Sequence, residues 1–178
     1  MENLLGDIWE WFRHKRKHFR AFAERDSRIE GWFKAEMIVL LNRLIRQGKV
    51  EEFEREYNTA KGERERRLID FRLHIHGQAH LCELKAMCIS QEAGTPRNLR
   101  FYFRDDHVGI IRDFKKLDRL ENRGKKWVLA FIYPSPEVDE WYDAIASLPN
   151  ELRHWRCLTQ PQDYPAFAFP ALWRQEQK

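Results

Sequence analysis

The chain has 178 residues, of which 43% are hydrophobic and 13% aromatic, and its formal net charge is +4. This length suits one domain, and this apolar content argues against an intrinsically disordered chain. No apolar run reaches the length of a membrane-spanning helix, and the basic N-terminal segment lacks the apolar core of a signal peptide. We therefore expect a cytoplasmic protein without membrane contact, and the positive charge favours an anionic partner.

Residues 1–26 are expected to form a basic amphipathic helix over Leu4–Glu24, with Leu5 and Ile8 on its apolar side. A basic run, RHKRKHFR, occupies positions 13–20. Three roles stay open for this segment: docking on the rest of the domain, a contact in a homodimer, and a basic arm that reaches an anionic partner.

A second helix is expected at Ser27–Gln47, where apolar residues recur at helical spacing in Ile29, Trp32, Phe33, Val39 and Leu40. Glu36 falls near the middle of this stripe. A carboxylate there is costly unless it is paired, protonated or bound to a metal. Two interpretations follow: Glu36 points at a metal site, or it forms a salt bridge, for example with Arg43.

Three strands follow the helix. The first is expected at Val50–Tyr57. Leu68–Ile75 alternates between apolar and polar residues, which is typical of a half-buried strand, and Ala79–Ile89 is a second run of this kind. Glycine in first place of a two-residue loop predicts a type II′ hairpin turn at Gly77–Gln78.

This turn would place Asp70 opposite Lys85 and Arg72 opposite Glu83, and paired residues share a face of the sheet. Asp70, Glu83 and Lys85 would then converge on one face. Two carboxylates suit a hard cation such as Mg²⁺, and a neighbouring ammonium stabilises charge on a phosphate. The alternative is a pair of ordinary cross-strand salt bridges, which contribute about 1 kcal/mol or less when exposed.

The pattern [DE]xK occurs three times, at Glu83–Lys85, Asp113–Lys115 and Glu176–Lys178. Composition alone yields about two such matches, so the pattern by itself is weak. Only the first match lies in an expected strand, after a strand that carries an aspartate and a helix that carries Glu36. In this arrangement, residues 27 to 134 resemble the PD-(D/E)xK, restriction-endonuclease-like nuclease superfamily, although Ile69 stands where that family often has its proline.

The resemblance implies a fold and an activity. The expected fold is an α/β (α+β) domain with the family's αβββαβ core, a mixed sheet flanked by helices, and an extra N-terminal helix. The implied activity is hydrolysis of phosphodiester bonds by a divalent-metal-dependent nuclease with Mg²⁺ or Mn²⁺, on DNA rather than RNA. Asp70, Glu83 and the backbone carbonyl of Leu84 would bind the metal, Lys85 would act on the attacking water, and Glu36 would bind a metal-bound water or a second ion.

The second half of the chain completes this core. A helix is expected from Asp105 or Asp106 to Glu121, and the apolar run Trp127–Tyr133 is typical of a buried central strand. Residues 135–178 form a C-terminal extension within a single domain of residues 1–178. In it we expect a helix at Glu137–Leu148 and a last strand at Leu152–Leu158.

Basic residues outside the motif predict contacts with nucleic acid. The segment Asn98–Arg104 alternates arginine with aromatic residues, a pattern that suits an extended segment on which bases stack. Its alternative is an amphipathic edge strand. The predicted nucleic-acid contacts are Arg72, Arg100, Arg104, Arg112, Lys115, Lys116 and Arg119.

Two further interpretations remain beside an active nuclease. One is a catalytically inactive protein of nuclease fold that binds nucleic acid or regulates a partner. The other is an unrelated α/β domain whose hairpin carries salt bridges. The position of Glu36 relative to the hairpin separates the nuclease fold from the unrelated domain.

Overall fold

The structure is a computed structural model that describes residues 1–25, 29–58, 68–89, 98–106, 109–120, 124–164 and 167–176. Among these residues no helix is both long enough and apolar enough to cross a membrane. In chain order the elements are η1 (Glu2–Leu4), α1 (Leu5–Arg13), α2 (Arg16–Glu24), α3 (Glu30–Arg46), β1 (Glu52–Asn58), β2 (Leu68–Ile75), β3 (Gln78–Cys88), α4 (Leu99–Tyr102), α5 (Ile110–Asp118), β4 (Lys125–Tyr133), α6 (Val138–Ala146), η2 (Asn150–Leu152), β5 (Trp155–Cys157), η3 (Pro161–Asp163) and β6 (Phe169–Gln175).

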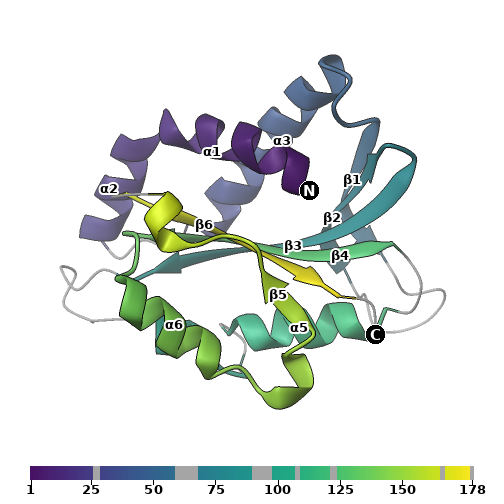
Figure 1. Cartoon of the computed structure of the whole chain (residues 1–178). Helices are drawn as coiled ribbons and strands as arrows, with labels where there is room; N and C mark the ends of the chain where they lie inside the picture. The colour runs from purple at the N-terminus through teal and green to yellow at the C-terminus, as the bar shows by residue number, and fades with distance from the viewer. Residues whose placement is uncertain are drawn as a thin grey trace.

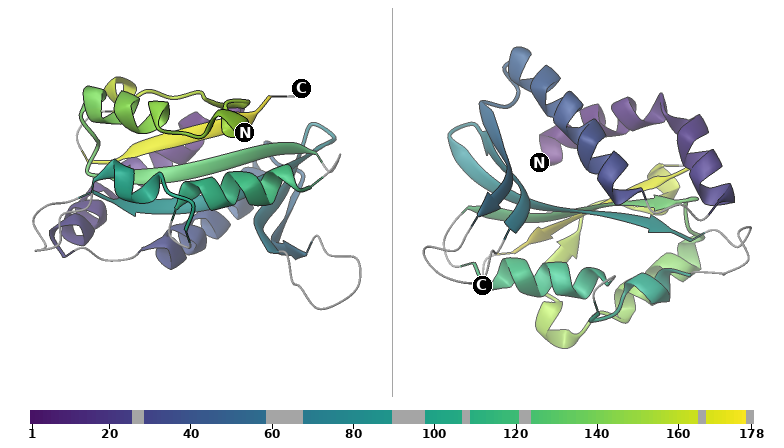
Figure 2. Two further views of the ribbon diagram at one scale, coloured as in Figure 1. Left: turned by 90° about the horizontal axis from the view of Figure 1, so that it is seen from below. Right: turned by 180° about the vertical axis from the view of Figure 1, so that it is seen from behind.

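One six-stranded sheet lies at the centre, with its strands in the order β1-β2-β3-β4-β6-β5. β3 and β4 are parallel, and the other neighbouring pairs are antiparallel. Helices α1, α2 and α3 cover one face of the sheet, and α5 and α6 cover the other (Figures 1 and 2). The expectation of a mixed sheet flanked by helices is confirmed.

Each face of the sheet has its own apolar core. On the face covered by α1–α3, the ring of Phe131 packs against Phe12 and Phe33 at centroid distances of 4.5 and 4.8 Å. On the other face, Trp173 packs against Phe114 and Trp141 at 5.8 and 5.6 Å. β4 lies between the two cores, and all its residues after Lys125 are buried, as expected of a central strand.

The basic N-terminal segment forms two helices instead of the single one expected. α1 ends at Arg13 and α2 begins at Arg16, with a turn between them. The break has a simple cause: positions 13–18 read RHKRKH and offer no apolar side chain, while the flanking Phe12 and Phe19 are fully buried against Phe131. Of the three roles left open, docking on the domain is observed.

The β2–β3 hairpin turns at His76 and Gly77, one residue earlier than expected. Both residues have positive φ, +51° and +70°, as a type I′ turn requires. Every cross-strand pair consequently shifts by two residues, so that Arg72 lies opposite Leu81 and Phe71 opposite Cys82. The expected register was wrong, but a shift of two residues leaves each side chain on the face that was expected.

Residues 135–178 contribute two strands to the same sheet as the core. β5 covers only the middle of the strand expected at Leu152–Leu158. β6, which was not expected, lies in the tail rich in proline and aromatic residues and pairs with β4 along its length. Pro170 hides this strand from sequence analysis, because a proline normally argues against a central strand.

Candidate active site

The candidate site lies where β3 loses β2 as a neighbour. The β2–β3 ladder ends at Phe71↔Cys82, while β3 continues beside β4 as far as Cys88. Beyond the ladder, the Asp70 carboxylate accepts a hydrogen bond from the Leu84 N–H at 2.9 Å. Side chains thus begin to replace the neighbouring strand, and charged groups from α3 and α5 approach this half of β3.

Asp70 sits between β3 and α3. Its Oδ1 lies 2.7 Å from the Lys34 ammonium, which also contacts Glu30 at 2.8 Å. Burial alone would lower the pKa of Lys34, but the hydrogen bonds to Asp70 and Glu30 outweigh it and raise this pKa. Lys34 is therefore a firmly charged partner of both carboxylates.

Glu83 is the most enclosed charge of the site, with only 3% of its surface exposed. The ammonium of Lys116, from α5, lies 2.5 Å from its Oε1, in ion-pair contact without the directionality of a hydrogen bond. Burial raises the pKa of Glu83 to about 8, the negative charge of Asp70 adds to this, and Lys116 opposes it. Such a buried carboxylate attracts any cation that can reach it.

Lys85 is held by two carboxylates. Its ammonium lies 3.0 Å from Asp113 Oδ2, on α5, and 3.9 Å from Glu30 Oε2, at the start of α3. Burial acts to lower the pKa of Lys85, but Asp113 and Glu30 prevail and raise it. Burial also raises the pKa of Asp113, and Lys85 opposes that shift.

Asp70, Glu83 and Lys85 therefore lie within one cluster of charges, as expected from the sequence. Four other members were not expected there: Glu30, Lys34, Asp113 and Lys116, of which Lys116 was predicted only as a nucleic-acid contact. Their signal in the sequence is weak: Glu30 and Lys34 are spaced i,i+4 at a helix start, and Asp113 lies one helical turn before Lys116. Such spacings are common on solvent-exposed helix surfaces, so nothing marked these pairs as parts of a site.

Glu36 does not lie with the cluster, and the expectation that it points toward Asp70 and Glu83 was wrong. Its carboxylate accepts a hydrogen bond from Trp11 Nε1 at 3.1 Å and contacts Lys15 at 3.0 Å. The apolar stripe of α3 was placed incorrectly: its buried residues are Phe33, Met37, Leu40, Leu41 and Leu44, whereas Val39 is 52% exposed. Glu36 thus flanks the stripe and faces α1. The position of Glu36 was the feature that would separate a nuclease fold from an unrelated α/β domain, and by that criterion the structure favours the unrelated domain. Glu30 is the carboxylate of α3 that reaches the cluster.

Hard cations prefer oxygen ligands, and the carboxylates of Asp70 and Glu83 are ligands of this type. In the part of the chain that the structure describes, no three His, Cys, Asp or Glu side chains are grouped so that they could hold a metal ion. Backbone oxygen adds to the two carboxylates of Asp70 and Glu83: because the N–H and C=O of one strand residue point to the same side, the Leu84 carbonyl is directed toward β2, as its N–H is.

The predicted nucleic-acid residues fall into two groups. Arg112 on α5 and Arg119 directly after it are exposed, whereas Lys115 contacts Asp105 at 2.6 Å and Lys116 contacts Glu83 at 2.5 Å. The other three arginines lie elsewhere in the fold, and each contacts a carboxylate: Arg72 with Glu54 at 2.5 Å, Arg100 with Asp143 at 3.6 Å, and Arg104 with Asp106 at 3.3 Å.

The extended segment or edge strand expected at Asn98–Arg104 is absent. Asn98 instead caps the short helix α4. Tyr102 of this helix is buried, and its hydroxyl donates to the carbonyl of Cys88 and accepts from the Cys88 N–H. Arg104 stacks on Phe101, 4.2 Å from the ring centroid. The Phe101 ring, which was expected to stack on a base, thus already stacks with Arg104 in the protein.

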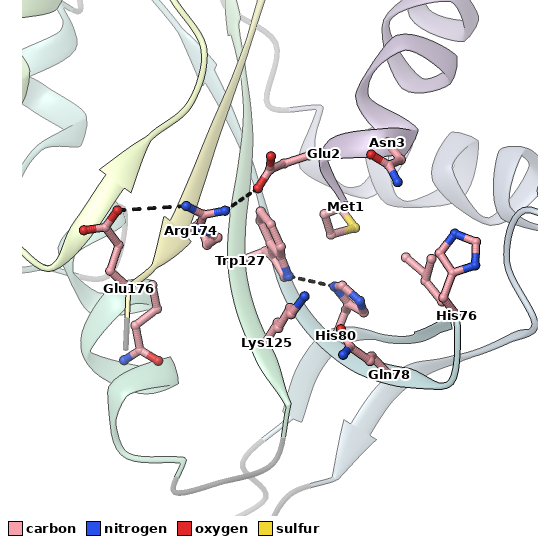
Figure 3. Close-up of a pocket in the computed structure, with 12 residues that line it drawn as sticks. Met1, Glu2, Asn3, His76, Gln78, His80, Lys125, Trp127, Arg174 and Glu176 are labelled. Carbon is pink, nitrogen blue, oxygen red and sulfur yellow. Dashed lines mark hydrogen bonds and ion pairs between the residues drawn. The ribbon is translucent and has the colours of Figure 1, made fainter. Parts of the chain in front are cut away.

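A cavity of about 640 Å³ lies at the other end of β3, apart from the charge cluster (Figure 3). Its lining includes His80, Lys125 and Trp127, and the Trp127 Nε1–H donates to His80 Nδ1 at 2.9 Å. Burial, assisted by nearby positive charge, lowers the pKa of His80 to about 4. His80 is thus a neutral acceptor.

No similar protein was found from which a function of the charge cluster could be transferred. Comparison of the chain with protein-family models, with curated proteins and with solved structures gives no significant match. The function of the cluster must therefore be argued from its own geometry.

Proposed function

We propose that the protein is a divalent-metal-dependent nuclease that hydrolyses phosphodiester bonds in DNA. One observation carries the proposal: Asp70, Glu83 and Lys85 share a buried charge cluster at the end of the β2–β3 ladder. These are three of the four residues that the resemblance to the PD-(D/E)xK superfamily assigns to catalysis; the fourth, Glu36, lies outside the cluster.

The order of the elements supports a restriction-endonuclease-like core. α3, β1, β2, β3, α5 and β4 follow one another in the order helix, three strands, helix, strand, with only the four-residue helix α4 inserted. The motif is distinguished by the helix and the strand that precede it, so only α5 and β4, which follow it, are independent support for the proposal.

The residues of the cluster fit a hard divalent cation such as Mg²⁺ or Mn²⁺. Asp70 and Glu83 supply carboxylates, the Leu84 carbonyl is directed to the side of β3 where Asp70 lies, and lysine ammonium groups already contact both carboxylates. These contacts indicate that positive charge is favoured there. A bound cation would supply Lewis acidity toward the scissile phosphate.

Lys85 has a separate task in this proposal. Its ammonium provides fixed positive charge beside the reacting phosphate, where charge increases in the transition state. Asp113 and Glu30 are positioning residues: they keep the side chain of Lys85 in place and charged. Glu30 thus reaches the cluster from α3, as Glu36 was expected to do, but in a different role.

The exposed basic residues of α5 suit the phosphates of a nucleic acid. Arg112 lies on the helix that also carries Asp113 and Lys116, and Arg119 directly follows this helix, so a strand bound along α5 would pass beside the cluster. Contacts of this kind weaken steeply as salt concentration rises.

The test is a cleavage assay on single-stranded, duplex and branched DNA and on RNA, with Mg²⁺, Mn²⁺ or EDTA. We expect DNA cleavage that requires the metal and that Glu83→Gln abolishes. A matched control is Glu54→Gln on β1, whose carboxylate contacts Arg72 away from the cluster. Cleavage that persists in EDTA, or in Glu83→Gln, would contradict the proposal.

A second candidate is a catalytically inactive protein of the same fold that binds nucleic acid or regulates a partner. The observation that favours it is the pairing of every carboxylate of the cluster with a lysine: Asp70 and Glu30 with Lys34, Glu83 with Lys116 and Asp113 with Lys85. Wild-type protein that binds DNA but cleaves none of the substrates would make this candidate the better one.

A further inference from the structure

The two lysines of the cluster that lie beside α5 are held in different ways. The side chain of Lys85 is 12% exposed and contacts two carboxylates, Asp113 and Glu30. The side chain of Lys116 is 32% exposed, and Glu83 is the one carboxylate that it contacts among the described residues. Lys116 is therefore the less restrained of the two.

The α5 helix directs Lys116 inward and its neighbour outward. Lys115 reaches Asp105 at 2.6 Å and leaves Asp105 largely exposed. Lys116 instead contacts Glu83, which is nearly inaccessible to solvent. A buried carboxylate needs a cation or a proton, and the ammonium of Lys116 is the cation that the chain itself provides.

A divalent cation bound to Glu83 would compete with this ammonium. Two positive charges within a few ångströms of one buried carboxylate repel each other strongly, because water screens them little there. Lys116 can relieve this repulsion, since its flexible stem can swing toward solvent. Lys85 cannot, because Asp113 and Glu30 hold it, and Lys34 keeps Glu30 as a partner if Asp70 binds a cation.

We propose that Lys116 is the counter-cation of Glu83 in the metal-free protein, and that a divalent cation displaces it onto a phosphate of the bound DNA. This inference rests on the proposed function. Arg112 on the same helix and Arg119 directly after it are exposed, so the released ammonium joins existing positive charge. Metal binding and DNA binding are thereby coupled through one side chain.

The first test is calorimetric titration of Mn²⁺ alone into wild type, Lys116→Gln, Lys116→Arg and the control Lys115→Gln. We expect Lys116→Gln to bind Mn²⁺ about tenfold more tightly, because the competing charge is gone. Lys116→Arg should bind at least threefold more weakly, because a guanidinium pairs more strongly with a carboxylate. Lys115→Gln should match wild type.

The outcomes separate this inference from the proposed function. Wild-type binding of Mn²⁺ with unchanged affinity in both Lys116 variants would overturn the displacement and leave the metal site intact. Absence of Mn²⁺ binding from wild type and all variants would overturn both. If Lys116→Gln fails to fold, the expected weakening in Lys116→Arg still decides the matter.

A second measurement tests where the ammonium goes. In a Lys85→Ala background, in which cleavage is expected to be about a hundredfold slower or more, the affinity for duplex DNA is measured against salt concentration with Mg²⁺ and with EDTA, before residual cleavage is appreciable. Adding Lys116→Gln should reduce the slope of log affinity against log salt by about one with Mg²⁺ and leave it unchanged in EDTA. Equal slopes with Mg²⁺ would overturn the contact with phosphate.

Discussion

The two halves of β3 differ in what lies beside them. The first half, from Gln78 to Cys82, pairs with β2 on one side, and from His80 onward it also pairs with β4 on the other. In the second half, the edge that β2 has left is met by side chains instead, Asp70 at Leu84 and Tyr102 at Cys88. His80 belongs to the first half, and Glu83 and Lys85 to the second.

The difference shows how one strand can hold two kinds of buried polar group. His80 is stabilised in its neutral form, and its pKa falls. Glu83 and Lys85 are surrounded by charges from three other elements, because helices can approach where a strand has ended. We therefore propose that the first half of β3 has a structural role and the second half a catalytic one. The predictions below test this division.

The largest effect is expected at Lys85. Lys85→Ala should lower turnover on DNA about a hundredfold or more, because the reacting phosphate loses a preorganised positive charge. Mn²⁺ affinity should stay near that of wild type, because the ammonium is not a metal ligand. His80→Gln, in the other half of β3, should cleave at the wild-type rate. Full activity of Lys85→Ala, measured by single-turnover cleavage, would show that the lysine is misassigned.

The second-largest expected effect is the loss of folding stability at low pH that His80 causes. Its pKa of about 4 lies below the ordinary value near 6.5, so the folded state binds fewer protons than the unfolded state between these values. The stability that neutral His80 provides is thus complete above pH 6.5 and is lost as pH falls toward 4. Relative to His80→Gln, wild type should lose about 2 kcal/mol of unfolding free energy from pH 6.5 to 4.5.

Urea denaturation of both proteins at several pH values measures this difference. Because both proteins contain the other titrating groups, their contributions to the pH dependence of stability cancel in the comparison. One of these groups is Glu83, whose raised pKa makes stability fall as pH rises from about 4.5 to 8. Parallel stability curves for wild type and His80→Gln would show that His80 is not buried as described.

The smallest effects distinguish two carboxylates of α3. Glu30→Gln should lower turnover about three- to tenfold, because Lys85 keeps Asp113 but loses its second partner. Glu36→Gln should cleave at the wild-type rate and lose about 1 kcal/mol of stability, because Trp11 and Lys15 lose a charged partner. The reverse pattern of rates would restore Glu36 to the site.

Two central strands, β2 and β4, were predicted closely. The alternation in Leu68–Ile75 gave β2 with its exact bounds, and the apolar run Trp127–Tyr133 gave most of β4. The faces of Asp70, Glu83 and Lys85 were also correct, although the register was not, because a period of two survives a shift of two residues.

The failures have local causes. The turn was misjudged because His76, a non-glycine residue, adopts positive φ next to Gly77. Glu36 was misplaced because Val39 is apolar yet exposed, which moved the expected stripe of α3. The roles of Asp113 and Lys116 depend on how α5 packs on β3, and contacts between distant elements leave no periodic pattern in a sequence.

The most direct test of the metal site is titration of Mn²⁺ into wild type and Asp70→Asn, with folding checked by circular dichroism. Asp70→Asn preserves the size of the side chain and an oxygen that can accept from the Leu84 N–H. We predict that wild type binds Mn²⁺ and that Asp70→Asn, still folded, does not. Equal binding by the two proteins, or no binding by wild type, would contradict the assignment of this cluster as the active site of a metal-dependent nuclease.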